Sequence, residues 1–143
     1  HGAEMSSLGA FVATVNFMIN NQVIDHIWRF GENLLDLMQK TIKEHGLENY
    51  FQIRGLPCSP YYFIFDKNGE SSLPLKTLFL QEMIKNGVLM QTVSPCFRHG
   101  EKELTITENA LNNTFKVFGK AVHGGVEKFL NGPKIKPVFR KYN

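Results

Sequence analysis

The sequence is poor in cysteine and has no long apolar run. Cys58 and Cys96 are its only cysteines, which excludes a disulfide-stapled scaffold, and they lack the paired spacing of a zinc site. We therefore expect free thiols in a reducing, cytoplasmic compartment. The most apolar stretch, residues 8–19, is interrupted by small and polar residues and falls short of the roughly 20 apolar residues that cross a bilayer. No membrane partner is expected.

A strong excess of one charge is also missing. The 143 residues carry 16 Lys and Arg against 13 Asp and Glu, dispersed along the chain, which argues against a nucleic-acid partner. With 43% hydrophobic and 12% aromatic residues, the chain can bury one sizeable core, and a single domain is predicted. We place that domain at residues 1–133 and interpret the basic residues 134–143 as a surface tail.

Helical patterns occupy the first third of the chain. Apolar residues at steps of three and four over residues 8–19 predict a helix that begins at Ser6 or Ser7 and buries one face. Burial of that face would contribute on the order of 10 kcal/mol before entropy is subtracted. A second helical pattern extends over residues 23–46, ending at a glycine.

The middle of the chain predicts strands. Residues 51–54 and 61–65 are typical of strands, and residues 55–60 between them contain a glycine and two prolines that argue against a continuous ladder. A helix then follows Pro74 and ends before Gly87, which supplies a left-handed residue. Residues 88–90 predict a short buried strand.

A last helix begins near Glu101 and keeps its apolar spacing to Val122. The order of helix, helix, strands, helix, strand and helix predicts an α+β fold, in which helices pack on one face of a small, mainly antiparallel sheet.

Three segments resemble one enzyme family in order and spacing. They are HGAEMSSLGAFVATVNF, LFLQEMIKNGVLM and RHGEKELTITENALNNTF, and together they span nearly the whole chain. The chain thus resembles the C-terminal small domain of class III, fold-type I pyridoxal-phosphate aminotransferases, in the branch that includes glutamate-1-semialdehyde aminomutase. The resemblance implies the same α+β domain, with the first long helix leaving a large domain.

The resemblance also implies a cofactor. The intact enzyme would use pyridoxal phosphate for amino-group transfer or 2,1-aminomutase isomerisation. In the family the Schiff-base lysine and the aspartate at the pyridine nitrogen precede the segment matching His1 and Gly2, so no catalytic residue is assigned here. His1 and Gly2 are the cofactor-binding candidates, next to the family's phosphate-binding turn. Pyridoxal phosphate is not expected to bind this chain alone, nor is catalysis.

Substrate-pocket candidates follow from the same resemblance. The family's charged substrate-binding positions fall near Gln91 and Thr92, and because neither is charged, a neutral, hydroxyl-rich substrate such as a sugar derivative fits them better than an α-carboxylate. Arg54 ends a predicted strand, where it either reaches the cleft of the intact enzyme or is solvated. The partners implied are small-molecule amino donor and acceptor and a second subunit, in a homodimer formed through the large domain.

The remaining reactive side chains have simpler interpretations. His99 at a helix start is more typical of local capping than of catalysis, and His26 and His123 lack metal-ligand spacing. Cys96 is interpreted as a quiet buried thiol.

Two other functions compete with the aminotransferase. A non-enzymatic protein-interaction module of similar α+β shape is the main alternative. A stand-alone hydrolase is disfavoured because no Gly-x-Ser-x-Gly or Cys-His signature is present.

Overall fold

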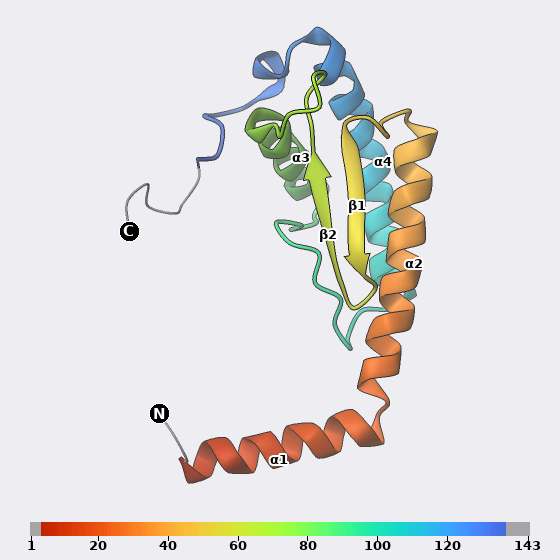
Figure 1. Ribbon diagram of the computed structural model, residues 1–143, viewed down its shortest axis with the longest axis vertical. Helices are drawn as coiled ribbons and strands as arrows, with labels where there is room; N and C mark the ends of the chain where they lie inside the picture. Colours follow the sequence, from red (N-terminus) through yellow and green to blue (C-terminus); the bar gives the residue numbers. More distant parts are fainter. Residues whose placement is uncertain (1–3, 137–143) are drawn as a thin grey trace.

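The computed structural model describes residues 4–136 as a helical layer against a hairpin, with one helix projecting from that body (Figure 1). Its α+β class confirms the prediction of helices on one face of a small antiparallel sheet. In chain order the elements are α1 (Met5–Asn20), α2 (Val23–Glu44), β1 (Phe51–Leu56), β2 (Ser59–Ile64), α3 (Leu73–Lys85), α4 (Glu101–Gly124) and the 3-10 helix η1 (Val126–Phe129).

The two strands form one antiparallel hairpin. Phe51 pairs with Ile64 and Leu56 with Ser59, so the ladder passes through residues 55–60, where an interruption was predicted. That expectation is wrong because a two-residue turn, Pro57–Cys58, suffices to reverse the chain. Gly55 adopts φ 105°, a conformation that side chains rarely take.

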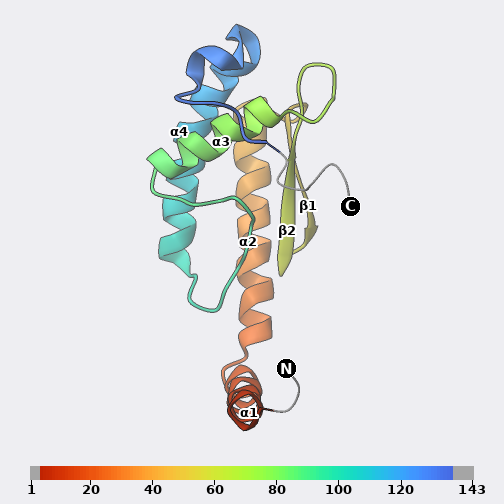
Figure 2. The same ribbon diagram turned by 90° about the vertical axis from the view of Figure 1, so that its left-hand side faces the viewer.

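Alternation along the hairpin places one face on the core. Figure 2 shows α2, α3 and α4 all on one side of the sheet. Phe51 is 1% exposed, and its ring lies 4.9 Å from that of Phe79 and 5.3 Å from that of Phe115 (centroid distances). These rings, which come from β1, α3 and α4, join the sheet to two of its covering helices.

Helix α3 matches the sequence prediction closely. The Ser72 hydroxyl accepts a hydrogen bond from the Leu75 N–H at 3.3 Å, which caps the helix start, and Pro74 lies in the first turn. At the other end Gly87 has φ 81° and the Val88 N–H donates to the Met83 carbonyl at 2.9 Å. The left-handed glycine therefore ends the helix as predicted.

Residues 88–90 are not a strand, and this prediction is wrong. They begin a coil that connects α3 to α4, in which Met90 is 6% exposed while Leu89 is 78% exposed. The Tyr62 hydroxyl, rather than a strand backbone, donates to the Met90 carbonyl at 2.8 Å. A short apolar run does not distinguish a buried coil from a strand, because both alternate buried and exposed side chains.

The helix predicted over residues 8–19 is confirmed as α1, but its buried face is not. None of its residues is buried; Phe11 is 66% exposed and Ile19 is 70% exposed. The helix begins at Met5, and Glu4 precedes it without a side-chain cap, so capping by Ser6 or Ser7 is also wrong. At 1.5 Å per residue its 16 residues extend about 24 Å, which carries most of the helix beyond the body.

The chain ends are described in part. His1 and Gly2, the cofactor-binding candidates, lie outside the described residues, as do positions 137–143 of the predicted tail. The first residues of that tail pack on α3, because the Ile135 N–H donates to the Thr77 hydroxyl at 3.0 Å. Among the described helices, none is long and apolar enough to cross a membrane.

Candidate functional site

A hollow of about 490 Å³ lies between the coil after α3, the middle of α2 and the start of α4. Residues 87–95 of the coil form one wall, Phe30 and Leu34 of α2 form the apolar base, and α4 closes the other side. Figure 2 shows this coil leaving α3 and running down beside α2 before it turns into α4. The hollow therefore joins three segments that are far apart in the sequence.

The structure places two of the predicted pocket residues in this hollow. Gln91 and Thr92 both line it and are exposed. The Thr92 and Ser94 hydroxyl oxygens are 3.3 Å apart, within hydrogen-bonding distance. This wall thus offers an amide and two hydroxyl groups, all of which both donate and accept hydrogen bonds.

His99 holds the end of the coil. Its Nδ1 accepts a hydrogen bond from the Cys96 N–H at 3.3 Å, which assigns the ring proton to Nε2 in the neutral form. Its backbone carbonyl lies 2.8 Å from Nε2 of His26, and its ring centroid is 5.2 Å from that of Phe30. His99 therefore has a local structural role in the coil and also lines the hollow, but it does not cap α4, whose N-cap is Gly100.

Among the described residues that line the hollow, Glu103 is the one with an acidic side chain. Its Oε2 accepts a hydrogen bond from the Gly100 N–H at 2.9 Å, at the start of α4. This bond, together with one from its own backbone N–H, lowers the pKa of the Glu103 carboxyl below its ordinary value. The carboxylate is consequently ionised at neutral pH, and one of its oxygens already has a partner.

Sequence reasoning missed Glu103 and Thr107 as site residues. They are four residues apart on α4 and therefore lie on the same face of the helix, next to the hollow. The sequence alone shows that Glu103 and Thr107 are four residues apart within a predicted helix. What was missing was the position of the coil, whose first residues, 88–90, were predicted to be a strand.

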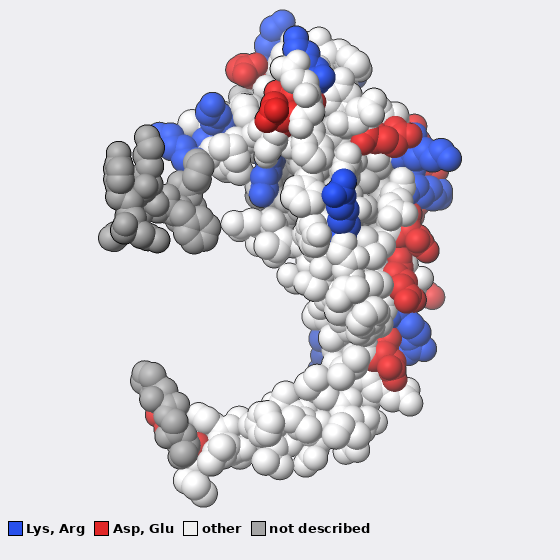
Figure 3. Space-filling model, viewed as in Figure 1, with Lys and Arg blue, Asp and Glu red and all other residues white. Residues whose placement is uncertain are grey.

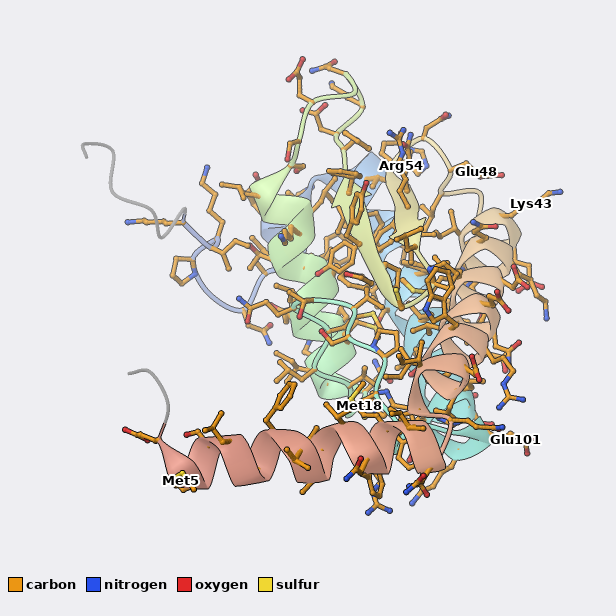
Figure 4. All side chains as sticks on the ribbon, turned by 60° about the horizontal axis from the view of Figure 1, so that its bottom comes forward. Met5, Met18, Lys43, Glu48, Arg54 and Glu101 are labelled. Carbon is orange, nitrogen blue, oxygen red and sulfur yellow. The ribbon has the colours of Figure 1, made fainter. Side chains whose placement is uncertain are left out.

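Arg54 lies apart from this site. It lines a shallow depression with Lys43 and Glu48, and Figure 4 shows these three residues gathered at one end of the molecule. Its Nη2 donates to Gln52 Oε1 at 2.7 Å, and its guanidinium carbon is 5.8 Å from the centroid of the Phe63 ring. Arg54 is exposed, so within this chain it is a solvated strand residue rather than a wall of the hollow.

The cysteines differ from expectation in one respect. Cys96 is exposed, so the prediction of a buried thiol is wrong, while Cys58 in the hairpin turn is half-buried. Cys96 belongs to the coil just before α4, where backbone hydrogen bonds to His99 hold it at the surface. No group of three potential metal ligands occurs in residues 4–136.

A second contact site joins α1 to the rest of the molecule. The Phe97 ring lies 5.6 Å from the Phe17 ring and 5.2 Å from the His26 ring (centroid distances). Only the last turns of α1 take part, since Met18 is half-buried and Met5 is 82% exposed (Figure 4). The coil that lines the hollow thus also holds the base of α1.

The residues of the hollow do not fit a complete pyridoxal-phosphate site. Within residues 4–136 no lysine lines it, so no amine is in place there for a Schiff base. No step of a reaction is therefore assigned to side chains of this chain.

Comparison with protein-family models, curated proteins and solved structures finds no match to this chain. A function must consequently be argued from the residues themselves.

Proposed function

We propose that this chain is the C-terminal small domain of a pyridoxal-phosphate-dependent aminotransferase or aminomutase, and that it forms the substrate side of the active site. The order of elements supports this proposal: two helices, a hairpin and two further helices in an α+β fold. So does the position of Gln91 and Thr92, which line the same hollow. Catalysis requires a lysine and an aspartate from another part of the enzyme.

The observation that carries the proposal is the surface of α1. Its residues Met5–Asn20 include no Lys, Arg, Asp or Glu, and none of them is buried. Figure 3 shows charged side chains along the outer flank of α2, while α1 is bare of charge. A helix that lacks charge on every side is typical of a protein interior, so a further body of protein is expected to cover it. A large domain would provide that body.

A reading frame extended upstream of His1 tests the proposal. The expected product contains a strand-ending lysine and a buried aspartate, shows a borohydride-sensitive absorbance band near ~420 nm, and transfers an amino group between two small molecules. A reading frame that encodes neither residue, or a product with no such band after incubation with pyridoxal phosphate, would contradict it.

The alternative is a non-enzymatic interaction module. A partner protein could also cover the uncharged surface of α1, but an interaction module gives no reason for the order of elements or for the position of Gln91 and Thr92 in the hollow. The upstream sequence separates the two: an interaction module needs no lysine or aspartate in cofactor-binding positions. Extended protein that binds another polypeptide through α1 but no pyridoxal phosphate would support the module.

A further inference from the structure

The hollow between the coil, α2 and α4 has the polar groups of a small-molecule site, and no Lys or Arg of residues 4–136 lines it. We propose that it binds a hydroxyl-rich molecule that carries an amino group, of the amino-sugar class, along Gln91, Thr92 and Glu103. This inference rests on the proposed function only in treating the bound molecule as the substrate. Binding itself is a property of the residues described here.

The size and base of the hollow suit a single sugar ring. Its volume of about 490 Å³ lies within the range of about 300–1,000 Å³ that is typical of small-molecule sites. Phe30 and Leu34 are 7% and 5% exposed and provide an apolar surface at its base. The C–H groups of a sugar ring can pack against such a surface, while its hydroxyl groups face the walls.

The walls provide groups that match hydroxyls. The amide of Gln91 and the hydroxyls of Thr92 and Thr107 each donate and accept hydrogen bonds, as sugar hydroxyls do. Thr107 is 9% exposed and lies on the α4 wall of the hollow.

The charge of the hollow favours an amine over an acid. In the part of the chain that the structure describes, no Lys or Arg lines it, Glu103 is its one carboxylate, and His99 is its one imidazole. Because Oε2 of Glu103 already accepts from Gly100, Oε1 is the oxygen left to accept from an ammonium group. A carboxylate or phosphate would be placed near the like charge of Glu103, which costs electrostatic free energy even though Lys102 and His99 lie close enough to act on that carboxylate.

Titration of the isotopically labelled chain with three matched probes tests the proposal. Glucosamine, glucose and glucuronate are single sugar rings of similar size and differ in charge, being cationic, neutral and anionic. We expect NMR shifts of amides in residues 88–95 and 103–107 with glucosamine, weaker shifts of the same amides with glucose, and none with glucuronate. Equal shifts with glucuronate, shifts scattered over the molecule, or no saturable shift with glucosamine would overturn the proposal.

Two substitutions locate the contacts. Glu103→Gln keeps an oxygen for the Gly100 N–H but removes the charge, and should weaken glucosamine about two- to fivefold more than it weakens glucose. Thr107→Val should weaken both sugars. Thr105→Val, on the exposed side of the same helix and outside the hollow, is the matched control and should weaken neither. Equal effects of the two threonine substitutions would contradict binding in the hollow.

The experiments distinguish a failure of the amino-sugar proposal from a failure of the aminotransferase proposal. If Thr107→Val fails to fold, as judged by its amide spectrum, Gln91→Ala on the exposed coil replaces it and should weaken both sugars. An extended protein that transfers amino groups while the sugars do not bind would refute only the ligand class. Sugar binding without cofactor chemistry in the extended protein would refute only the aminotransferase.

Discussion

One close contact determines how the hairpin turn packs on α2. At Gly31 of α2, a Cβ atom would overlap the carbonyl oxygen of Pro57 in the hairpin turn. The glycine therefore permits the tip of the hairpin to lie directly on the helix backbone. Gly31 is in the middle of an amphipathic helix, where a glycine otherwise lowers stability. The sequence contains no indication of this role, because the contact partner is 26 residues away in the chain.

Substitution Gly31→Ala should lower the free energy of unfolding by about 1–3 kcal/mol, because either the turn or the helix must move. Urea unfolding measures the change. Gly119→Ala is the matched control: Gly119 lies within α4 and has open space around the Cβ position, so alanine should raise stability by up to about 1 kcal/mol. If both substitutions stabilise the protein, the close approach at Pro57 is incorrect.

Tyr62 links the hairpin to the coil and should make stability depend on alkaline pH. Burial raises the pKa of Tyr62 to about 12. Since the unfolded chain ionises this phenol at lower pH than the folded chain, its contribution is complete below the unfolded-state pKa and is lost as pH rises through the folded-state pKa. Urea unfolding between pH 8 and about 12 should show this decline.

Tyr62→Phe removes that pH-dependent part and also the hydrogen bond to the Met90 carbonyl, which costs about 1 kcal/mol at neutral pH. Tyr61→Phe is the control, because the Tyr61 side chain is 50% exposed on the opposite face of the same strand. If the wild type and Tyr62→Phe lose the same amount of stability between pH 8 and about 12, the Tyr62 phenol is not the cause of the alkaline decline.

Among the secondary-structure elements, those that depend on local sequence were predicted correctly from the spacing of apolar residues. The helices α2, α3 and α4 follow from apolar spacing, and the end of α3 follows from Gly87. The coil after α3 could not be predicted, because its backbone has no ladder and its buried side chains alternate as in a strand. The hollow depends on that coil. Gln91 and Thr92 could be named from the sequence, but their neighbours on α2 and α4 could not.

The stability that Glu103 contributes at the start of α4 should depend on pH in the acidic range. Glu103 has a lowered pKa in the folded state, so its contribution is present above the unfolded-state pKa and is lost as pH falls through the folded-state pKa. We expect wild type to be more stable than Glu103→Gln at neutral pH, with a difference that shrinks on acidification. Urea unfolding at several pH values tests this. Glu101→Gln, on the same turn, controls for the loss of one negative charge.

An unchanging difference between wild type and Glu103→Gln down to low pH would contradict the assignment of the Gly100 hydrogen bond to the ionised carboxylate.

The whole molecule consists of a packed body and a projecting helix. Apolar periodicity identified α1 as a helix but wrongly predicted that this chain buries it. An apolar pattern indicates that a helix surface is buried in the native protein, but it does not indicate which protein segment covers it. In Figure 3, α1 is an uncharged arm that forms the lower edge of a concave side of the molecule.

The isolated chain should therefore self-associate through α1. Sedimentation velocity should show concentration-dependent association, which Val12→Asp reduces because it adds a charge to the apolar surface. Ile84→Asp on α3 is the matched control, since Val12 and Ile84 are both 56% exposed. Equal effects of the two substitutions, or a chain that stays monomeric at all concentrations, would contradict an exposed docking surface on α1.

The most direct test of the proposed aminotransferase function is to reduce the extended protein with borohydride in the presence of pyridoxal phosphate and map the modified lysine by mass spectrometry. We predict one pyridoxyl-lysine, located upstream of His1, and none among the lysines of this chain. A stoichiometric pyridoxyl-lysine within the present sequence, or none anywhere, would contradict the proposal.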